Sequence, residues 1–113
     1  MTFKQITDSF NKRFYDLSAS LYDHQYKFNH LQLDSDSIYF DSDSERKKEY
    51  AVIICECYRD LVALSGDVAT FFRFASKDSE KDVLWKLHVE IDDYYDKFFD
   101  FVHEVRVMYH WDY

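Results

Sequence analysis

Scattered histidines and a surplus of carboxylates are the residues of this chain that could do acid–base or metal chemistry. The chain has 5 His and 22 Asp or Glu in 113 residues. Asp100 and His103 stand three residues apart, a spacing that places both side chains on one side of a helix. Carboxylate-bridged di-metal bundles need two such pairs and two further carboxylates that face inward. No other carboxylate here has a His three residues on, so we expect no metal site and no cofactor.

The two cysteines lie two residues apart, as Cys55 and Cys57, in an apolar segment. Residues two apart point to different faces of a helix, so we expect neither a disulfide between them nor a shared metal. Free cysteine is among the most buried residue types, and both should lie reduced at or near the core. The first residues lack the continuous apolar segment of a signal peptide, and no stretch of about 18 apolar residues could span a membrane. These features predict a cytoplasmic protein without a membrane segment.

No local signature of an enzyme is present. The single Gly excludes the glycine-rich loops GxGxxG and GxxxxGK, which bind nucleotide phosphates. No Ser–His–acid or Cys–His motif can be identified among sequence neighbours. The segment from Arg106 to His110 resembles, over a handful of residues, the Arg–spacer–His element of helical ribonucleases of the HEPN type, with a spacer one residue shorter. One turn apart, both side chains can instead interact with the last carbonyl groups of a helix, and we expect a protein that is not an enzyme.

Apolar residues recur at steps of three, four or seven through most of the chain, which is the period of an amphipathic helix. The pattern predicts helices over about 2–31, 43–75 and 78–109, with a loop at about 32–44 that is rich in Ser and Asp. The absence of Pro and the single Gly disfavour a fold of many tight turns. We therefore predict an all-α antiparallel bundle of three long helices in a single domain, residues 1–113.

Capping signals mark where these helices should begin. Thr2 with Gln5 fits a capping box for the first helix, and Ser42 with Glu45 fits one for the second. Three residues could cap the third helix. These candidates are Ser76, Asp78 and Ser79.

Two alternatives concern the middle helix. Gly66 would give a four-helix bundle if it broke the helix, although the heptad phase continues across it and favours a kink. A buried strand over 50–58 is the competing interpretation of a segment rich in β-branched residues. Residues 38–40 are expected to tuck back onto the bundle. The strongest core positions are Phe14, Leu17, Ile54, Leu61, Leu84, Leu87, Ile91 and Phe98.

The charge is unevenly placed. A net charge of −8 argues against direct nucleic-acid binding, which needs surplus Lys and Arg to neutralise phosphates. Residues 78–113 carry a net −6. Within them Asp93, Asp96, Asp100 and Glu104 follow i, i+3, i+7, i+11 spacing and form one carboxylate per turn. We call these four residues the acidic ridge; Asp92 flanks it.

A second acidic cluster lies in the expected loop. Residues 34–45 carry a net −5, and the run lacks the Gly and the length that a calcium-binding EF-hand loop requires. We expect a flexible acidic loop, which would lose entropy on binding and contribute less than the ridge. Its candidate residues are Asp34, Asp36, Asp41 and Asp43.

Aromatic residues are unusually frequent, at 20% of the chain. Tyr and Trp are enriched at protein interfaces because they supply large amphipathic contact areas, although they can also widen the core of a thin bundle. Eight of them fall off the main apolar stripes. They are Tyr15, Tyr22, Tyr26, Tyr39, Tyr95, Tyr109, Trp111 and Tyr113.

Together these features predict a small acidic binding protein that occupies and blocks a basic site on a nucleic-acid-handling protein such as a nuclease or toxin. A phage-type inhibitor or DNA mimic and a toxin-neutralising immunity protein both fit, since complementary charge would steer either to its partner. The alternative is a homo-oligomeric helical scaffold, a homodimer for example, in which the heptads pack between copies.

Overall fold

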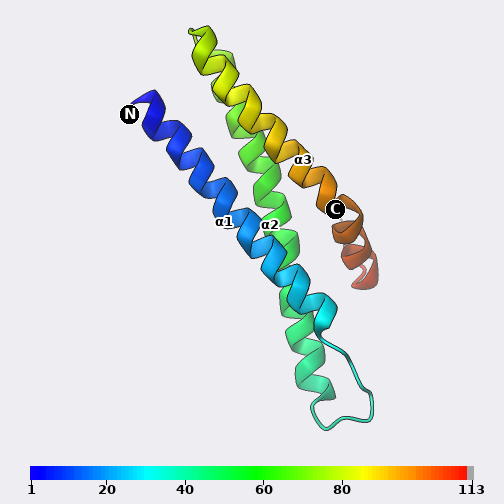
Figure 1. Cartoon of the computed structure of the whole chain (residues 1–113). Helices are drawn as coiled ribbons and strands as arrows, with labels where there is room; N and C mark the ends of the chain where they lie inside the picture. The colour runs from blue at the N-terminus through cyan, green and yellow to red at the C-terminus, as the bar shows by residue number, and fades with distance from the viewer. Residues whose placement is uncertain (112–113) are drawn as a thin grey trace.

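The computed structural model of the chain describes residues 1–111 and is built from three helices, with no strand among those residues. They are α1 (Phe3–His30), α2 (Phe40–Phe74) and α3 (Asp78–Met108). Two short connections reverse the chain, so that α2 runs against both α1 and α3 (Figure 1). The prediction of an all-α bundle of three long helices is confirmed.

The first helix begins where its capping box predicts. The Gln5 backbone N–H donates to Thr2 Oγ1 at 3.2 Å, and the Thr2 backbone N–H donates to Gln5 Oε1 at 2.9 Å. Two N–H groups that have no partner within the helix are satisfied in this way.

The second helix begins earlier than expected, and its predicted capping box is wrong. The N-cap is Tyr39, which makes no side-chain capping bond. Ser42 already lies inside the first turn, where its hydroxyl donates to the Tyr39 carbonyl at 3.0 Å. Asp41 and Asp43 occupy the same turn, and their negative charge is favourable beside the positive end of the helix dipole. The side chains of Ile38 and Tyr39 are exposed, so the expected tuck of residues 38–40 does not form there.

The whole of α2 is one uninterrupted helix of 35 residues. It includes Tyr50–Tyr58, so the strand alternative is wrong, and it passes through Gly66 without a break, so there is no fourth helix. Gly66 lies on the exposed face, while Leu64 and Val68 on either side of it are fully buried. Packing on the buried face therefore holds the helix together across the glycine.

The third helix begins at Asp78 after the N-cap Lys77, which makes no side-chain capping bond. The predicted boundary is correct, but Ser76 and Ser79 do not cap it. Asp78 and Glu80 lie in the first turn, where charge takes the place of a capping side chain.

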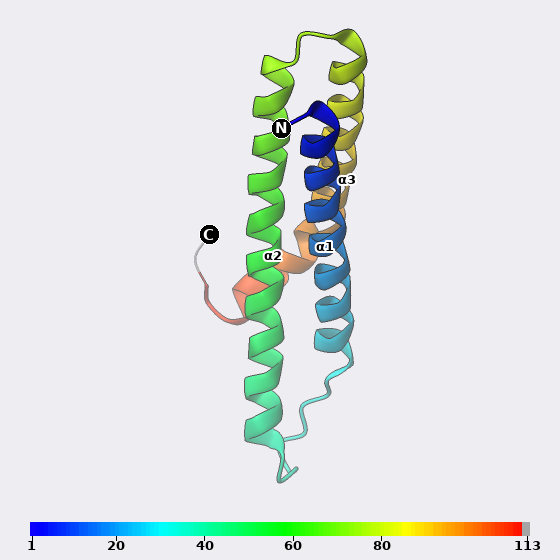
Figure 2. The same ribbon diagram turned by 90° about the vertical axis from the view of Figure 1, so that its left-hand side faces the viewer.

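Most helix–helix contact involves α2, because α1 and α3 each pack along it and touch one another only sparsely. In Figure 2 the C-terminal turns of α3 cross behind α2 and emerge on its other side. The buried residues of α2 recur at steps of three and four and form one stripe that faces both neighbours. The buried side chains of α2 are Ala51, Ile54, Cys57, Tyr58, Leu61, Leu64 and Val68.

The predicted core is confirmed in α2 and α3, where all six expected positions are buried. It is wrong in part for α1, since Phe14 and Leu17 are only half-buried. The sparse contact between α1 and α3 leaves one flank of α1 open, so its best-buried apolar side chains are Phe10, Leu21 and Phe28. In the part of the chain that the structure describes, no helix is both long enough and apolar enough to cross a bilayer.

Candidate functional site: the acidic face of α3

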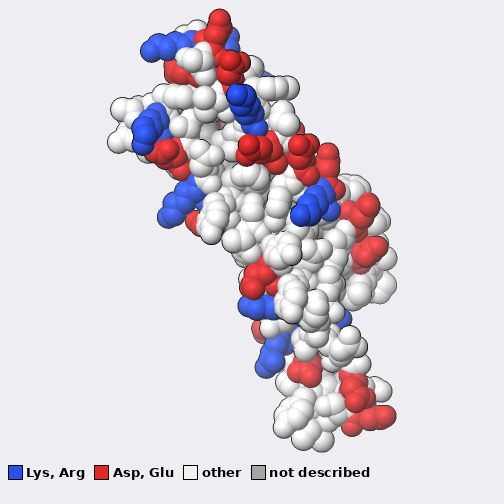
Figure 3. All heavy atoms as spheres, in the orientation of Figure 1, with Lys and Arg blue, Asp and Glu red and all other residues white. Residues whose placement is uncertain are grey.

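The acidic ridge lies on the outer face of α3. All four of its side chains are exposed, whereas Ile91, Phe98, Val102 and Val105 of the same helix are buried against its neighbours. No described Lys forms an ion pair with a ridge carboxylate. In Figure 3, acidic side chains follow the edge of the molecule along which α3 runs. The structure therefore presents Asp93, Asp96, Asp100 and Glu104 as four exposed carboxylates along one helix face, with one exposed lysine, Lys97, among them.

Asp92 sits beside the ridge but is turned toward α2. Its Oδ1 accepts a hydrogen bond from Ser65 Oγ at 2.8 Å, and its Oδ2 lies 3.3 Å from His88 Nδ1. His88 Nε2 is in turn 3.3 Å from Ser65 Oγ. The three side chains thus form a closed set of contacts between α2 and α3.

This set shares the residue types of a Ser–His–acid triad, and sequence reasoning missed it because Ser65 and Asp92 are far apart along the chain. In a catalytic triad the serine hydroxyl gives its proton to the histidine, and nearby N–H groups bind the oxyanion. Here the hydroxyl donates to Asp92, and Ser65 lies inside α2, where backbone N–H groups are bonded within the helix. The geometry suits a polar contact that fixes α3 against α2.

Aromatic rings flank the ridge on the side nearer α2. Trp85 and His88 stack with an interplanar angle of 12°, and Phe99 and His103 with one of 9°. Trp85 is 57% exposed and Phe99 49% exposed; Phe99 lies within the span of the ridge, and Trp85 lies about two turns before Asp93. Aromatic residues are enriched at protein interfaces, whereas Asp and Glu are depleted there, so the exposed rings rather than the carboxylates have the composition of an interface.

The second acidic cluster is divided between a loop and a helix. Asp34 and Asp36 are exposed in the connection before α2, where Asp34 Oδ1 accepts from the Asp36 backbone N–H at 3.0 Å. Asp41 and Asp43 belong to the first turn of α2. The expectation of one acidic loop over 32–44 is therefore correct only for its first half.

Tyrosines of α1 form a second exposed surface. Tyr15, Tyr22 and Tyr26 are 73%, 61% and 58% exposed, and with Tyr94 of α3 they line a shallow hollow. The Tyr94 hydroxyl donates to the Ser18 carbonyl at 2.8 Å, which ties α3 to α1 at this point.

The other aromatic residues that fall off the main apolar stripes differ in how far they are buried. Tyr39 is exposed, whereas Tyr95, Tyr109 and Trp111 pack against the core. Tyr113 lies outside the described residues.

Both cysteines are free and lie at or near the core, as predicted. Burial raises the pKa of the Cys55 thiol and that of the Cys57 thiol. Cys57 Sγ donates to Ser20 Oγ at 3.4 Å, which links α2 to α1. Thiols held protonated in this way are poor nucleophiles and poor metal ligands.

Among residues 1–111 no three or more His, Cys, Asp and Glu side chains are grouped closely enough to hold a metal ion. Asp100 remains on the ridge, while the His103 ring stacks on Phe99.

The function of this surface has to be argued from its own chemistry. In comparisons with known proteins, no protein-family model, no curated protein and no solved structure matches this chain.

Proposed function

We propose that this protein is a non-enzymatic binding protein whose acidic ridge occupies a basic site on another protein. The observation that carries the proposal is that four exposed carboxylates follow one face of α3, one per turn. Like charges one turn apart cost a few tenths of a kcal/mol per pair in a helix. A partner rich in Lys and Arg would turn that repulsion into attraction and would associate quickly.

The spacing of the ridge favours a partner that normally follows a phosphate backbone. From Asp93 to Glu104 the helix rises about 16 Å, at 1.5 Å per residue. Over that length one strand of B-DNA carries about five phosphates, at one per 3.4 Å. Four carboxylates therefore supply most of the charge of a single strand over that length, at a wider spacing of about 5.5 Å. A nuclease, a toxin or another nucleic-acid-handling enzyme has the matching surface, and the role is that of an inhibitor, DNA mimic or immunity protein in the cytoplasm.

The test compares two sets of substitutions that remove four charges each. The partner is first captured from the host lysate and purified. The ridge variant is Asp93→Asn, Asp96→Asn, Asp100→Asn and Glu104→Gln, and the matched control is Asp34→Asn, Asp36→Asn, Asp41→Asn and Asp43→Asn. Ridge substitutions should keep the fold, because those side chains lie off the buried stripe, and should weaken binding by more than the control does.

Salt provides an independent readout. Association of the wild-type protein should slow steeply between about 50 and 500 mM salt, because the Debye length falls from over 10 Å to about 4–5 Å. Binding that is indifferent to salt would mean that the apolar and tyrosine surfaces make the contact. A ridge variant that binds as tightly as wild type would show that the ridge is only a solvated face.

The second candidate is a homo-oligomeric scaffold, and the exposed tyrosines of α1 favour it. Large amphipathic side chains in a row, such as Tyr15, Tyr22 and Tyr26, suit the packing of one copy against another. The molar mass in solution decides between the candidates. A monomer across the micromolar range would exclude the scaffold, and a stable dimer dispersed by Tyr22→Glu would support it.

A further inference from the structure

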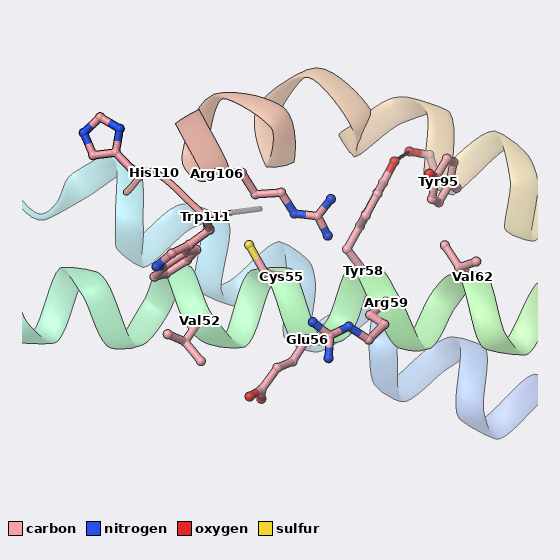
Figure 4. A pocket seen from close by; sticks show the side chains of 10 residues that line it. All are labelled: Val52, Cys55, Glu56, Tyr58, Arg59, Val62, Tyr95, Arg106, His110 and Trp111. Atoms are coloured by element: carbon pink, nitrogen blue, oxygen red, sulfur yellow. Dashed lines mark hydrogen bonds between the residues drawn. The ribbon is translucent and has the colours of Figure 1, made fainter. Parts of the chain in front are cut away.

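Three hollows follow one another along the same side of the contact between α2 and α3. The largest, of about 720 Å³, lies under the C-terminal half of α3, which arches over α2 in Figure 4. The next, of about 170 Å³, shares Val62 and Tyr95 with it. The third, of about 250 Å³, begins where His88 contacts Ser65 of the second. The hollows therefore form one groove along residues 52–73 of α2, about 32 Å long at 1.5 Å per residue.

The α2 wall of this groove is a second stripe of that helix, separate from its buried one. Its residues recur at steps of three and four, which is the spacing of one helix face. All of them are exposed or half-buried, so α1 and α3 leave this stripe largely uncovered. They are Val52, Cys55, Arg59, Val62, Gly66, Ala69 and Arg73.

The opposite wall and the far end of the groove are aromatic. Trp85 and Tyr95 line it from α3, and Phe99, which is 49% exposed, follows Tyr95 by one turn. The turn after α3 brings Trp111 back over α2 beside Val52, as Figure 4 shows. Both tryptophans of the chain thus lie in the groove, one at each end. Large rings opposite small aliphatic residues suit the apolar face of a helix.

Gly66 lies near the middle of the α2 stripe, and no contact within the molecule accounts for it. It is the one glycine of the chain, and a Cβ atom built there meets nothing within 4 Å. Glycine inside a helix lowers its stability relative to alanine, but it lets another backbone approach closely. A helix that packs on this stripe from outside gives the glycine a role.

The two edges of the groove differ in charge. On the α2 edge, Arg59 and Arg73 are exposed two heptads apart, and neither forms an ion pair with a described carboxylate. Glu56 is the one acidic residue among the described lining of that wall. On the α3 edge, Asp96 and Asp100 of the acidic ridge each directly follow an aromatic residue of the groove wall. An occupant therefore meets guanidinium groups on one side and carboxylates on the other.

We propose that this groove binds one amphipathic helix of the partner protein. The apolar face of that helix packs against Val62 and the rings of α3, as in other helix-in-groove complexes. Acidic residues on one flank of the helix meet Arg59 and Arg73, and basic residues on the other flank meet the ridge. Such charge complementarity fixes the direction in which the helix lies. The basic flank rests on the proposed function, in which the ridge meets Lys and Arg, whereas the apolar face and the acidic flank do not.

Two designed helical peptides of about three heptads test the groove. Both have Leu at the apolar positions and equal numbers of Glu and Lys, but the first has Glu on one flank and Lys on the other, and the second alternates them along both flanks. The indole N–H signals of Trp85 and Trp111 in the full chain report the two ends of the groove by NMR. The first peptide should shift both signals with one dissociation constant, and the second should bind about tenfold more weakly. Equal binding of the two peptides, or a shift of only one signal, would overturn the proposal.

A matched pair of variants tests whether the helix lies on the α2 stripe. Gly66→Gln places a long side chain at the middle of the groove, and it should keep the fold because Gln has the higher helix propensity. It should weaken binding of the first peptide at least about fivefold. Ala63→Gln makes a similar change three residues away, where the helix lines a hollow beside α1, and should leave the affinity nearly unchanged. Equal effects of the two variants would contradict the proposed position.

The captured partner separates this inference from the proposed function. If Gly66→Gln binds that partner as tightly as wild type while the ridge variant does not, the groove is not the docking site and the ridge is. If the ridge variant binds as tightly as wild type while Gly66→Gln does not, the groove is retained and the role of the ridge is refuted.

Discussion

His110 adopts a backbone conformation that side chains other than glycine disfavour. Its φ is 56°, in the left-handed region, and it directly follows the C-cap of α3, Tyr109. The His110 N–H donates to the Val107 carbonyl at 3.2 Å and the Trp111 N–H to the Arg106 carbonyl at 2.9 Å. These two bonds are the Schellman pattern, which usually places Gly at the position of His110. The strain is the cost of turning Trp111 back onto α2.

Replacing His110 by glycine should therefore stabilise the protein, whereas replacing it by alanine should not. His110→Gly is expected to raise the free energy of unfolding by about 0.5–1 kcal/mol, because glycine adopts positive φ without a Cβ clash. His110→Ala keeps the clash and loses the imidazole, so it should give no such gain. Urea unfolding of the three proteins measures the difference, and equal stability of the Gly and Ala variants would contradict the assignment of strain.

Gly66 is the opposite case, a glycine where a side chain would fit. It lies within α2, and a Cβ atom built there meets nothing within 4 Å. Gly66→Ala should stabilise the protein by about 0.5–1 kcal/mol, since alanine has the higher helix propensity and restricts the unfolded chain. Thermal unfolding checks this, and a lower midpoint would mean that the helix needs its glycine.

At the scale of the elements, the apolar spacing predicted the three helices because each buries a continuous stripe. The helix start that failed, that of α2, depends on a competition: Ser42 could act as a cap or lie within the first turn, where its hydroxyl donates to the Tyr39 carbonyl. The acidic ridge was predictable because its spacing lies within one helix. The contact of Asp92 with Ser65 was not, because it depends on how α3 is rotated against α2.

Truncating a buried side chain of α2 should lower the free energy of unfolding by more than truncating a half-buried one of α1. Leu61 is fully buried, and Leu61→Ala should cost about 2–5 kcal/mol from lost burial and the cavity left behind. Leu17 is half-buried on the open flank of α1, so Leu17→Ala should cost less than about 2 kcal/mol. Denaturant unfolding compares the two, and a larger loss for the Leu17 variant would contradict the central role of α2.

The whole molecule is elongated. Its extents are 62 × 23 × 18 Å and its radius of gyration is 17.5 Å, against about 13 Å for a compact domain of this length. Its accessible surface of 7869 Å² also exceeds the roughly 6,600 Å² typical of a monomer of its mass. A rod made of three helices therefore exposes more apolar and aromatic side chains than a sphere would, which explains the exposed surfaces on α1 and α3.

Stability should fall at alkaline pH. Burial raises the pKa of the phenols of Tyr58, Tyr94 and Tyr109, and of the Cys55 and Cys57 thiols. As the pH rises past the unfolded values of 9.0 for Cys and 10.0 for Tyr, the unfolded chain releases protons that the folded protein retains. The free energy of unfolding is then lost with rising pH.

Urea midpoints at pH 7, 9 and 10.5 measure this loss. Tyr58→Phe should be less stable at pH 7 by about 1 kcal/mol, since it loses the hydrogen bond from the Tyr58 hydroxyl to the Tyr95 carbonyl. The same variant should lose less stability between pH 9 and 10.5 than wild type does. Midpoints that do not change up to pH 10.5 would contradict the burial of these groups.

Because α1 and α3 share little contact except through α2, the molecule resembles two helical hairpins that have one helix in common. Each outer helix can detach without first separating the other pair, so local opening need not be global unfolding. Amide hydrogens at the centre of α2 should then exchange with solvent most slowly, and those of α1 and α3 at two separate, faster rates. A partner bound on α3 would slow exchange in α3 and α2 and leave α1 free to open.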